Sequence, residues 1–169
     1  MIRWFKVLAA ASILATVAAC GSDNDVASSE RNLVEQAQAD SRFSILAEAV
    51  VAADLAPTLS GAGPFTVFAP TNEAFAALLA ELGVTQAQLL ADKPLLTKVL
   101  TYHVVAGRVL KADVPVGVPI KTLQGGTFTI NDALVISDQR GRTARIVETD
   151  VLVSNGVIHA IDKVILPAP

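Results

Sequence analysis

The order of apolar and polar positions between residues 65 and 82 predicts a buried strand followed by a helix. Residues 65–69 form a short run of aromatic, β-branched and small apolar side chains, which has the length of a strand. Pro70 ends this run because proline lacks the N–H that a sheet ladder needs. Thr71 or Asn72 can then cap a helix, since both side chains accept hydrogen bonds from backbone N–H groups. The apolar face of this helix consists of Phe75, Leu78, Leu79 and Leu82.

Apolar side chains at helical spacing predict further helices on both sides of this segment. Two short helices precede it, one over residues 33–37 and one over residues 43–55. After it, residues 85–88 have the form of a capping box, in which a threonine hydroxyl and a glutamine amide satisfy each other's backbone donors. A last helix is predicted from Pro94 onward. Its apolar face holds Leu95, Leu96, Val99, Leu100 and His103.

The second half of the chain consists of short β-rich runs that are separated by Gly, Asn and Asp residues. The predicted strands are residues 120–123, 127–130, 133–136, 144–147, 151–153 and 157–166. Asn155-Gly156 is the strongest hairpin signal, because both residues tolerate the positive φ that a type I′ turn requires. Helices followed by strands predict an α+β domain, with a compact antiparallel β-sandwich and helices packed along one side.

Three segments resemble the signature boxes of the fasciclin domain family, in the order that the family has. Residues 65–75 resemble its first box, residues 101–107 its Tyr-His box, and residues 154–167 its closing box. The resemblance covers residues 32–167, so we expect a single fasciclin-like domain there, in a bacterial secreted protein or lipoprotein. It implies the fasciclin-like fold, a wedge-shaped β-sandwich with helices along one side.

The amino-terminal residues have the pattern of an export signal. Arg3 and Lys6 precede an uncharged stretch over residues 7–19, and Cys20, the only cysteine, follows it. At helical rise this stretch spans about 20 Å, which is short of the roughly 30 Å hydrocarbon core of a bilayer. We therefore expect no permanent membrane span from these residues.

Residues 17–20, Val-Ala-Ala-Cys, resemble the bacterial lipobox. The resemblance implies a signal peptide over residues 1–19 and a diacylglyceryl group on Cys20; the alternative is an ordinary signal peptide that contains a cysteine. Residues 20–31 are polar and predict a flexible tether after the lipidated cysteine. Gly21 stands where an aspartate usually retains Gram-negative lipoproteins at the inner membrane. The resemblance thus implies a cell-envelope lipoprotein of the outer membrane, on its periplasmic or its surface face.

The charge of the chain argues against nucleic acid as a partner. The formal net charge is −3, and it becomes −5 once residues 1–19 are removed with their two basic side chains. A protein that binds phosphate backbones needs a clustered basic surface. The one cluster, Arg140, Arg142 and Arg145 around Gly141, has two interpretations. We favour a solvated hairpin tip, and the alternative is a contact for an anionic glycan or a lipid headgroup.

Side chains that carry enzyme chemistry are scarce in the mature chain. It holds two histidines and no nucleophile elbow, His-Glu-x-x-His pair or phosphate loop. His103 lies on an apolar helix face, which favours a hydrogen-bonded core histidine over a ligand or a base. A metal site from His103, His159 and Asp162 would need the fold to bring them together, as would a catalytic cleft that joins Tyr102 and His103 to acids. We expect no enzyme activity, no metal and no cofactor.

The resemblance to fasciclin domains points to a binding module. In animal matrix members, an Asp-Ile pair before the closing box and the Tyr-His region are associated with integrin recognition. Asp150 and Val151 match the first, and Tyr102 and His103 match the second. A bacterial export signal removes integrin, so the expected partner is a protein or polysaccharide of the envelope or the extracellular space. The residues by themselves favour structural roles, with Val151 in a strand and Tyr102 packed with its hydroxyl satisfied.

Two functions therefore compete. The first is a non-enzymatic, lipid-anchored adhesion or interaction module of the cell envelope. The alternative is a carrier of a small apolar ligand, such as a pigment or a lipid. Hydrophobic residues make up 52% of the chain, but alanine and the signal raise this figure, and a packed core explains it as well as a cavity does. The sequence leaves the oligomeric state open, with a monomer favoured.

Overall fold

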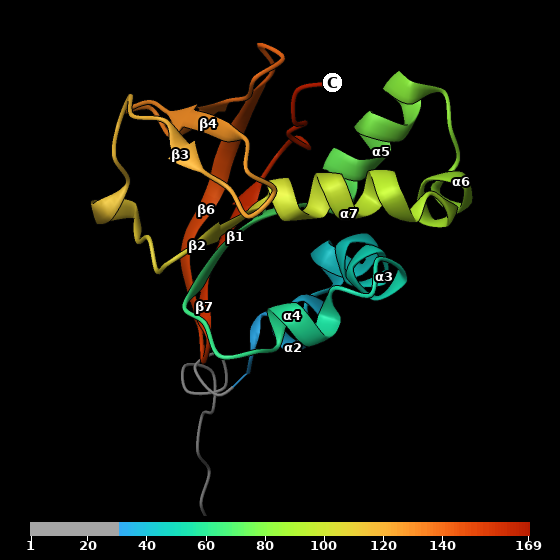
Figure 1. Ribbon diagram of the computed structural model, residues 1–169, viewed down its shortest axis with the longest axis horizontal. Coiled ribbons are helices and arrows are strands. Elements are labelled where there is room, and N and C mark those ends of the chain that lie inside the picture. The colour runs from blue at the N-terminus through green and yellow to red at the C-terminus, as the bar shows by residue number, and fades with distance from the viewer. Residues whose placement is uncertain (1–30) are drawn as a thin grey trace, which may run out of the picture.

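A computed structural model of the chain describes residues 31–169. Helices come first and strands later, and together they form an α+β domain (Figure 1). The predicted signal peptide over residues 1–19, the lipidation of Cys20 and the tether up to residue 30 lie outside the described residues. Within residues 31–169, none of the helices combines the length and the apolar character that crossing a membrane requires.

Helices make up most of the first half of the domain. Their bounds are α2 Leu33–Ala39, η1 Ser41–Phe43, α3 Ser44–Ala52, α4 Ala56–Leu59, α5 Asn72–Leu82, α6 Gln86–Ala91, α7 Lys93–Tyr102 and η2 Lys111–Asp113. The predicted capping box before α6 is confirmed, because Thr85 and Gln88 bond to each other's backbone N–H groups. Asn32 and Glu35 make the same arrangement at the start of α2. Local side-chain contacts of this kind determine where these helices begin.

The strands form one mixed sheet with the order β2-β1-β7-β6-β5-β4-β3. Their bounds are β1 Phe65–Pro70, β2 Val104–Ala106, β3 Ile120–Lys121, β4 Thr127–Ile130, β5 Val135–Ser137, β6 Thr143–Val153 and β7 Gly156–Ile161. The α+β fasciclin-like fold is confirmed, but β1 and β7 pair in parallel, whereas the prediction was an antiparallel sheet. The other neighbouring strands pair antiparallel. A parallel pair needs a long crossover, and here α5, α6, α7 and the other strands supply it.

Three further features of the strands differ from the predictions. β2 was not predicted, because three residues are too few to show an alternating pattern. The predicted strands 144–147 and 151–153 are one long strand, β6, and two shifts of its register against β7 account for the break in the apolar pattern. The predicted strand 157–166 ends at Ile161.

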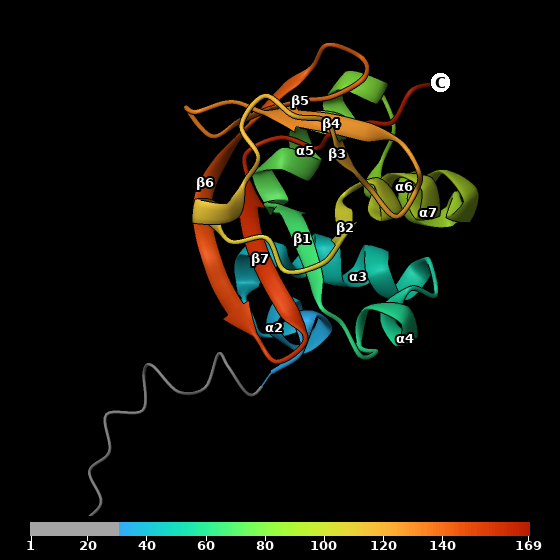
Figure 2. The ribbon, with the colours of Figure 1, turned by 60° about the vertical axis from the view of Figure 1, so that its left-hand side comes forward.

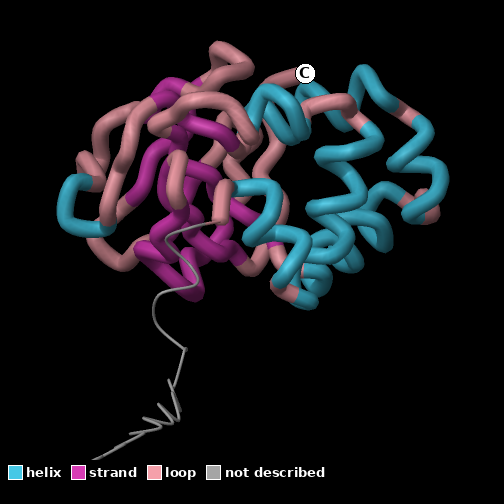
Figure 3. Tube along the Cα trace, turned by 90° about the horizontal axis from the view of Figure 1, so that it is seen from below, coloured by secondary structure: helices cyan, strands magenta, loops and turns pink. Residues whose placement is uncertain are grey.

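The helices and the curved sheet enclose two apolar cores. Figure 3 shows the α-helices on one side of the domain and the strands on the other, with the short η2 on the strand side, and Figure 2 shows β6 bending along the sheet. The core between the helices and the sheet includes Phe43, Leu46, Phe75, Leu96 and Ile158. The core inside the β3–β6 half of the sheet includes Phe68, Tyr102, Phe128, Ile136 and Ile165. The long strands β1, β7 and β6 are neighbours in the sheet, and both cores pack against them.

The turn between β1 and α5 contacts the helices that precede β1 as well as the helix that follows it. Of the two predicted caps, Thr71 is the cap, and its hydroxyl accepts the N–H of Ala74 at 3.3 Å. Asn72 reaches back to the start of α3 instead. Its Oδ1 accepts the N–H of Ile45 at 3.1 Å, and its Nδ2 donates to the carbonyl oxygen of Ser41 at 2.8 Å. Asn72 therefore fixes α3 against α5.

The turn between β6 and β7 is not the predicted type I′ turn at Asn155-Gly156. The hairpin loop lies one residue earlier, and neither Asn155 nor Gly156 has a positive φ. The Asn155 side chain accepts the N–H of Leu33 at 3.0 Å. It also donates to the carbonyl oxygens of Leu59 at 2.7 Å and of Gly61 at 3.0 Å. Asn155 thus holds α2 and the end of α4 against the sheet, which is a role that a turn signal does not reveal.

Candidate functional site

Asp150, the first predicted contact residue, lies where β6 is distorted. Two register shifts against β7 bend the strand here, and Asp150 adopts a φ of 59°, in the left-handed region that residues with a side chain rarely occupy. Its Oδ1 accepts the backbone N–H of Lys111 at 2.8 Å. Its own N–H donates to Nδ1 of His159 at 3.3 Å. Neighbours from η2 and β7 therefore hold Asp150 in one conformation.

Exposed apolar side chains flank Asp150 along β6. Val147 is 56% exposed and Leu152 is 40% exposed, while Val151 is half-buried. β5 pairs with β6 only at residues 143–145, so beyond residue 146 one edge of β6 has no neighbouring strand within the described part of the chain (Figure 2). We call residues 147–152 the β6 bulge surface. A group of exposed apolar side chains is typical of an interaction surface.

Tyr102, from the second predicted region, lies in the interior. Its hydroxyl donates to the carbonyl oxygen of Thr127 at 2.7 Å, and its ring meets Phe128 edge to face, with 6.1 Å between the centroids. Burial raises the pKa of Tyr102, so the phenol stays protonated and keeps its bond to Thr127. The side chain has the packed structural role that its residue type suggested, and a partner on the surface does not reach it.

His103 is buried as well, at the end of α7. Its Nδ1 lies 2.8 Å from the carbonyl oxygen of Val99, and its Nε2 lies 3.2 Å from the backbone N of Ile165. A carbonyl oxygen needs a donor and an N–H needs an acceptor, so the ring is neutral with its proton on Nδ1. Burial lowers the pKa of His103 to about 4, against the smaller opposing effects of the bond to Val99 and of the Asp138 carboxylate. Its hydrogen bonds fix α7 to the carboxy-terminal segment.

The two predicted contact regions, Asp150 with Val151 and Tyr102 with His103, are connected through the core and do not form one surface. Tyr102 contacts Phe128, and Phe128 contacts Phe68 edge to face, with 5.1 Å between centroids. Phe68 stacks on His159 at 5.4 Å, and His159 accepts the N–H of Asp150. This aromatic row places Tyr102 and Asp150 at opposite ends of a packed interior. Of the predicted contact residues, only Asp150 and Val151 are accessible to a partner.

His159 also bonds only to backbone groups. Its Nε2 lies 2.8 Å from the carbonyl oxygen of Val109, which leaves Nδ1 as the acceptor for Asp150. Burial lowers the pKa of His159, so this ring is neutral too. Asp162 does not join it, because its carboxylate accepts the N–H of Arg145 at 2.7 Å. Residues 31–169 contain no group of three His, Cys, Asp or Glu side chains that could hold a metal ion.

The arginine cluster surrounds the turn between β5 and β6, as predicted. Buried Asp138 shapes this turn, since its Oδ1 accepts the N–H groups of Arg140 and Arg142, both at 2.9 Å. Its Oδ2 accepts the N–H of Leu166 at 3.0 Å. Sequence reasoning missed Asp138, although an aspartate followed three residues later by Gly141 is typical of a type I turn. Asp138 connects the turn to the carboxy-terminal segment.

Comparison with known proteins identifies the family. The Fasciclin domain model matches residues 41–167. The chain belongs to the fasciclin domain family. Protein sll1483 of Synechocystis is 48% identical over 142 residues, which cover 82% of this chain and 75% of that protein. Human periostin is 33% identical over 144 residues, which cover 82% of this chain and 16% of periostin.

A solved structure has the same fold. It is a FAS1 domain pair from the insect cell adhesion molecule Fasciclin I, and it matches with a TM-score of 0.72. The match covers 82% of this chain and 51% of the insect chain, at 16% sequence identity. At that identity the likeness establishes the fold alone.

The three boxes of this fasciclin domain lie side by side. The first box forms β1 and the start of α5, the Tyr-His box forms the end of α7 and β2, and the closing box forms β7 and the segment after it. β2, β1 and β7 are neighbours in the sheet, and most of their side chains are buried. The boxes therefore build the core of the fasciclin domain, and the β6 bulge surface lies beside them.

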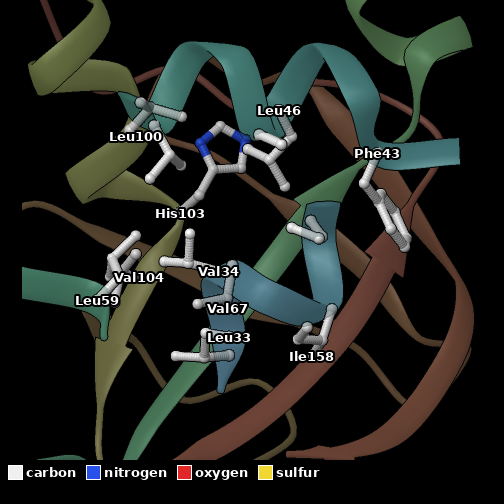
Figure 4. A pocket seen from close by; sticks show the side chains of 14 residues that line it. Leu33, Val34, Phe43, Leu46, Leu59, Val67, Leu100, His103, Val104 and Ile158 are labelled. Atoms are coloured by element: carbon white, nitrogen blue, oxygen red, sulfur yellow. The ribbon is translucent and has the colours of Figure 1, made fainter. Parts of the chain in front are cut away.

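A small apolar pocket lies between the helices and the sheet of the fasciclin domain. Figure 4 shows the His103 ring among apolar side chains that include Leu46 and Leu100. Its volume is about 30 Å³, whereas ligand pockets usually measure about 300 Å³ or more. A pigment or a lipid does not fit into this pocket as it stands.

Proposed function

We propose that this fasciclin domain is a non-enzymatic adhesion module of the cell envelope, and that it binds a protein or polysaccharide through the β6 bulge surface. One observation carries the proposal: exposed Val147 and Leu152 flank a fixed Asp150 on a strand edge that no other described strand covers. Membership of the fasciclin domain family, whose model matches residues 41–167, supports it. Val147 and Leu152 would supply apolar contacts, and Asp150 a directed polar one.

In this proposal Tyr102 and His103 stabilise the site from the interior and do not contact the partner. Both are buried and bonded to backbone groups, so they fix the interior on which β6 rests. Asp150 and Val151 remain as contacts. The Oδ1 of Asp150 already accepts the N–H of Lys111, and its Oδ2 accepts no hydrogen bond from residues 31–169. We assign Oδ2 to the partner.

Replacing Val147 and Leu152 together by serine should weaken adhesion about tenfold or more, because serine removes the apolar area that these two side chains would bury against the partner. The measurement is the binding of the purified protein to separated protein and polysaccharide fractions of the envelope. Val116 and Val118, which are 54% and 53% exposed, form a matched control pair when replaced by serine. Equal binding by both double variants, or equal losses in both, would contradict the role of the β6 bulge surface.

The location of the module is a second part of the proposal. We place it on the outer membrane through lipid on Cys20, with residues 20–31 as the tether. The tether enters the domain at Arg31, whose carbonyl oxygen accepts the N–H of Ser154 at 2.8 Å. Asp150 lies four residues from Ser154 along the chain, so it is at most about 13 Å from this entry point.

Removal of the Cys20 thiol tests the anchor. A Cys20→Ala variant should move from the membrane fraction to the soluble fraction, because alanine has no thiol to carry the acyl chains that would hold the protein at the membrane. Fractionation of cells that express each form measures this change. A variant that stays in the membrane fraction would rule out the lipid on Cys20 as the anchor.

The competing functions have less support. The apolar carrier lacks room, since the pocket beside His103 has a volume of about 30 Å³. A catalytic role for Tyr102 and His103 would need an accessible polar group, whereas both side chains are buried and bonded to backbone atoms. The formal net charge of −5 for the chain without residues 1–19 opposes binding to nucleic acid.

A further inference from the structure

A cleft at one end of β6 carries two basic side chains. It lies between α5 and the β5–β6 turn, and its volume of about 480 Å³ is within the range of ligand sites. Figure 1 shows α5 at the end of the domain opposite to α2, and the cleft lies at the α5 end. The side chains that matter for its chemistry are Leu78, Glu81, Arg142, Thr143, Lys163 and Val164.

The cleft has a net positive charge on an acidic protein. Arg142 forms an ion pair with Glu81, which joins the turn to α5 across the cleft. Lys163 is exposed and forms no ion pair with any residue in the described range 31–169. Two cationic side chains face one carboxylate, so the cleft favours an added anion. Arginine and lysine bind carboxylates through charge-assisted hydrogen bonds.

Both cations start from fixed backbone positions. The N–H of Arg142 donates to buried Asp138, and the side chain of Arg142 is itself only 25% exposed. The residue before Lys163 is Asp162, whose carboxylate accepts the N–H of Arg145 on the neighbouring strand. Binding of an anion would therefore order mainly the Lys163 side chain, because Arg142 is already held by its bonds to Asp138 and Glu81.

The rest of the lining matches a sugar ring. Ala77 is the exposed apolar residue of the lining, Leu78 and Val164 are buried beside it, and Thr143 and Glu81 place a hydroxyl and a carboxylate at the rim. A sugar has an apolar C–H face, hydroxyl groups and, in uronic acids, a carboxylate. These three features correspond to the apolar Ala77, the polar rim and the two cations.

We propose that this cleft binds a uronic acid unit of an acidic polysaccharide, with the sugar carboxylate between Lys163 and Arg142. A lipid headgroup is a poorer fit, because the cleft lies at the other end of β6 from Arg31, where the proposed tether enters the domain. The site is separate from the β6 bulge surface and does not depend on the proposed function of that surface.

Titration of the purified protein with tetragalacturonate at low salt tests this site. Lys163→Met should bind at least tenfold more weakly, since it removes the unpaired cation and keeps the side-chain length. Lys121→Met, on β3 at the far edge of the sheet, makes the same charge change and should leave the affinity unchanged. Glu81→Gln should tighten binding about threefold, because Arg142 then loses its competing carboxylate. The methyl ester of tetragalacturonate should bind at least tenfold more weakly.

Several results would overturn the proposal. They are equal affinities of the two lysine variants, equal binding of the methyl ester, or binding of phosphatidylglycerol vesicles through Lys163 without binding of tetragalacturonate. A thermal melt of Lys163→Met that matches the unmodified protein shows that the variant folds. The variant with serine at Val147 and Leu152 should keep its affinity for tetragalacturonate, so failure of one site and failure of the other are distinguishable.

Discussion

Replacing Gly156 by alanine is expected to lower the free energy of unfolding by about 4 kcal/mol or more. The added Cβ would lie 2.0 Å from the carbonyl oxygen of Phe65 and 2.9 Å from its carbonyl carbon. Phe65 and Gly156 are partners at the start of the parallel β1–β7 ladder. The clash is thus between the added Cβ and the backbone of β1, and the two strands can relieve it only by giving up their pairing at this end of the ladder.

Urea unfolding followed by circular dichroism measures this loss, and Gly83→Ala is the control. Gly83 ends α5 with a φ of 66°, and no atom would lie within 4 Å of its added Cβ. Alanine there should cost only about 1 to 2 kcal/mol, the energy of the left-handed backbone. Similar losses at the two glycines would mean that β1 and β7 can separate locally, and the steric explanation would then fail.

Gly156 also shows why a sequence signal can point to the right residue for the wrong reason. Asn-Gly usually marks a turn because glycine tolerates positive φ. Here Gly156 is required because it has no Cβ, and Gly63 is similar, since its Cβ would lie 2.1 Å from the carbonyl oxygen of Asn155. Conformational freedom and close approach both select glycine, so the sequence cannot distinguish them.

Local features of this fold were predictable, and long-range features were not. The Thr85 capping box and the Thr71 cap depend on neighbours within a few residues, so their patterns are visible in the sequence. The parallel pairing of β1 with β7 joins segments about ninety residues apart, and no local pattern encodes it. The continuity of β6 was hidden because its bulges interrupt the alternation of apolar side chains.

The candidate site also has one part that was predictable from the sequence and other parts that were not. The family resemblance identified Asp150, and the fold adds its neighbours, because Lys111 and His159 reach it from elsewhere in the chain. The exposure of Val147 and Leu152 depends on β5 ending its pairing at residue 145, which the sequence does not indicate. The cleft beside Lys163 needs α5 and the β5–β6 turn to meet, and that contact is long-range as well.

Acidification from pH 7 to pH 4 is expected to lower the free energy of unfolding by up to about 3 kcal/mol through His103 alone. The pKa of His103 is lowered from its ordinary 6.5 to about 4 because the ring is buried. Between pH 6.5 and about pH 4, His103 binds a proton in the unfolded chain but not in the folded protein. Stability therefore falls as the pH falls below 6.5, and the loss levels off below about pH 4. His159 should act in the same direction, since burial also lowers its pKa.

Two measurements isolate this effect from the protonation of carboxylates. The first follows the ring resonances of His103 by NMR, and the ring should remain neutral down to about pH 4.5. The second compares urea unfolding of the unmodified protein and of His103→Phe between pH 7 and pH 4. The phenylalanine variant leaves the carbonyl oxygen of Val99 without its donor, so it is less stable at every pH, but its stability should fall less steeply on acidification. Two results would contradict this explanation: equal slopes in the two proteins, or titration of the ring near pH 6.5. Either would show that the His103 ring accepts a proton in the folded state, so a neutral ring would not be what bonds α7 to the carboxy-terminal segment.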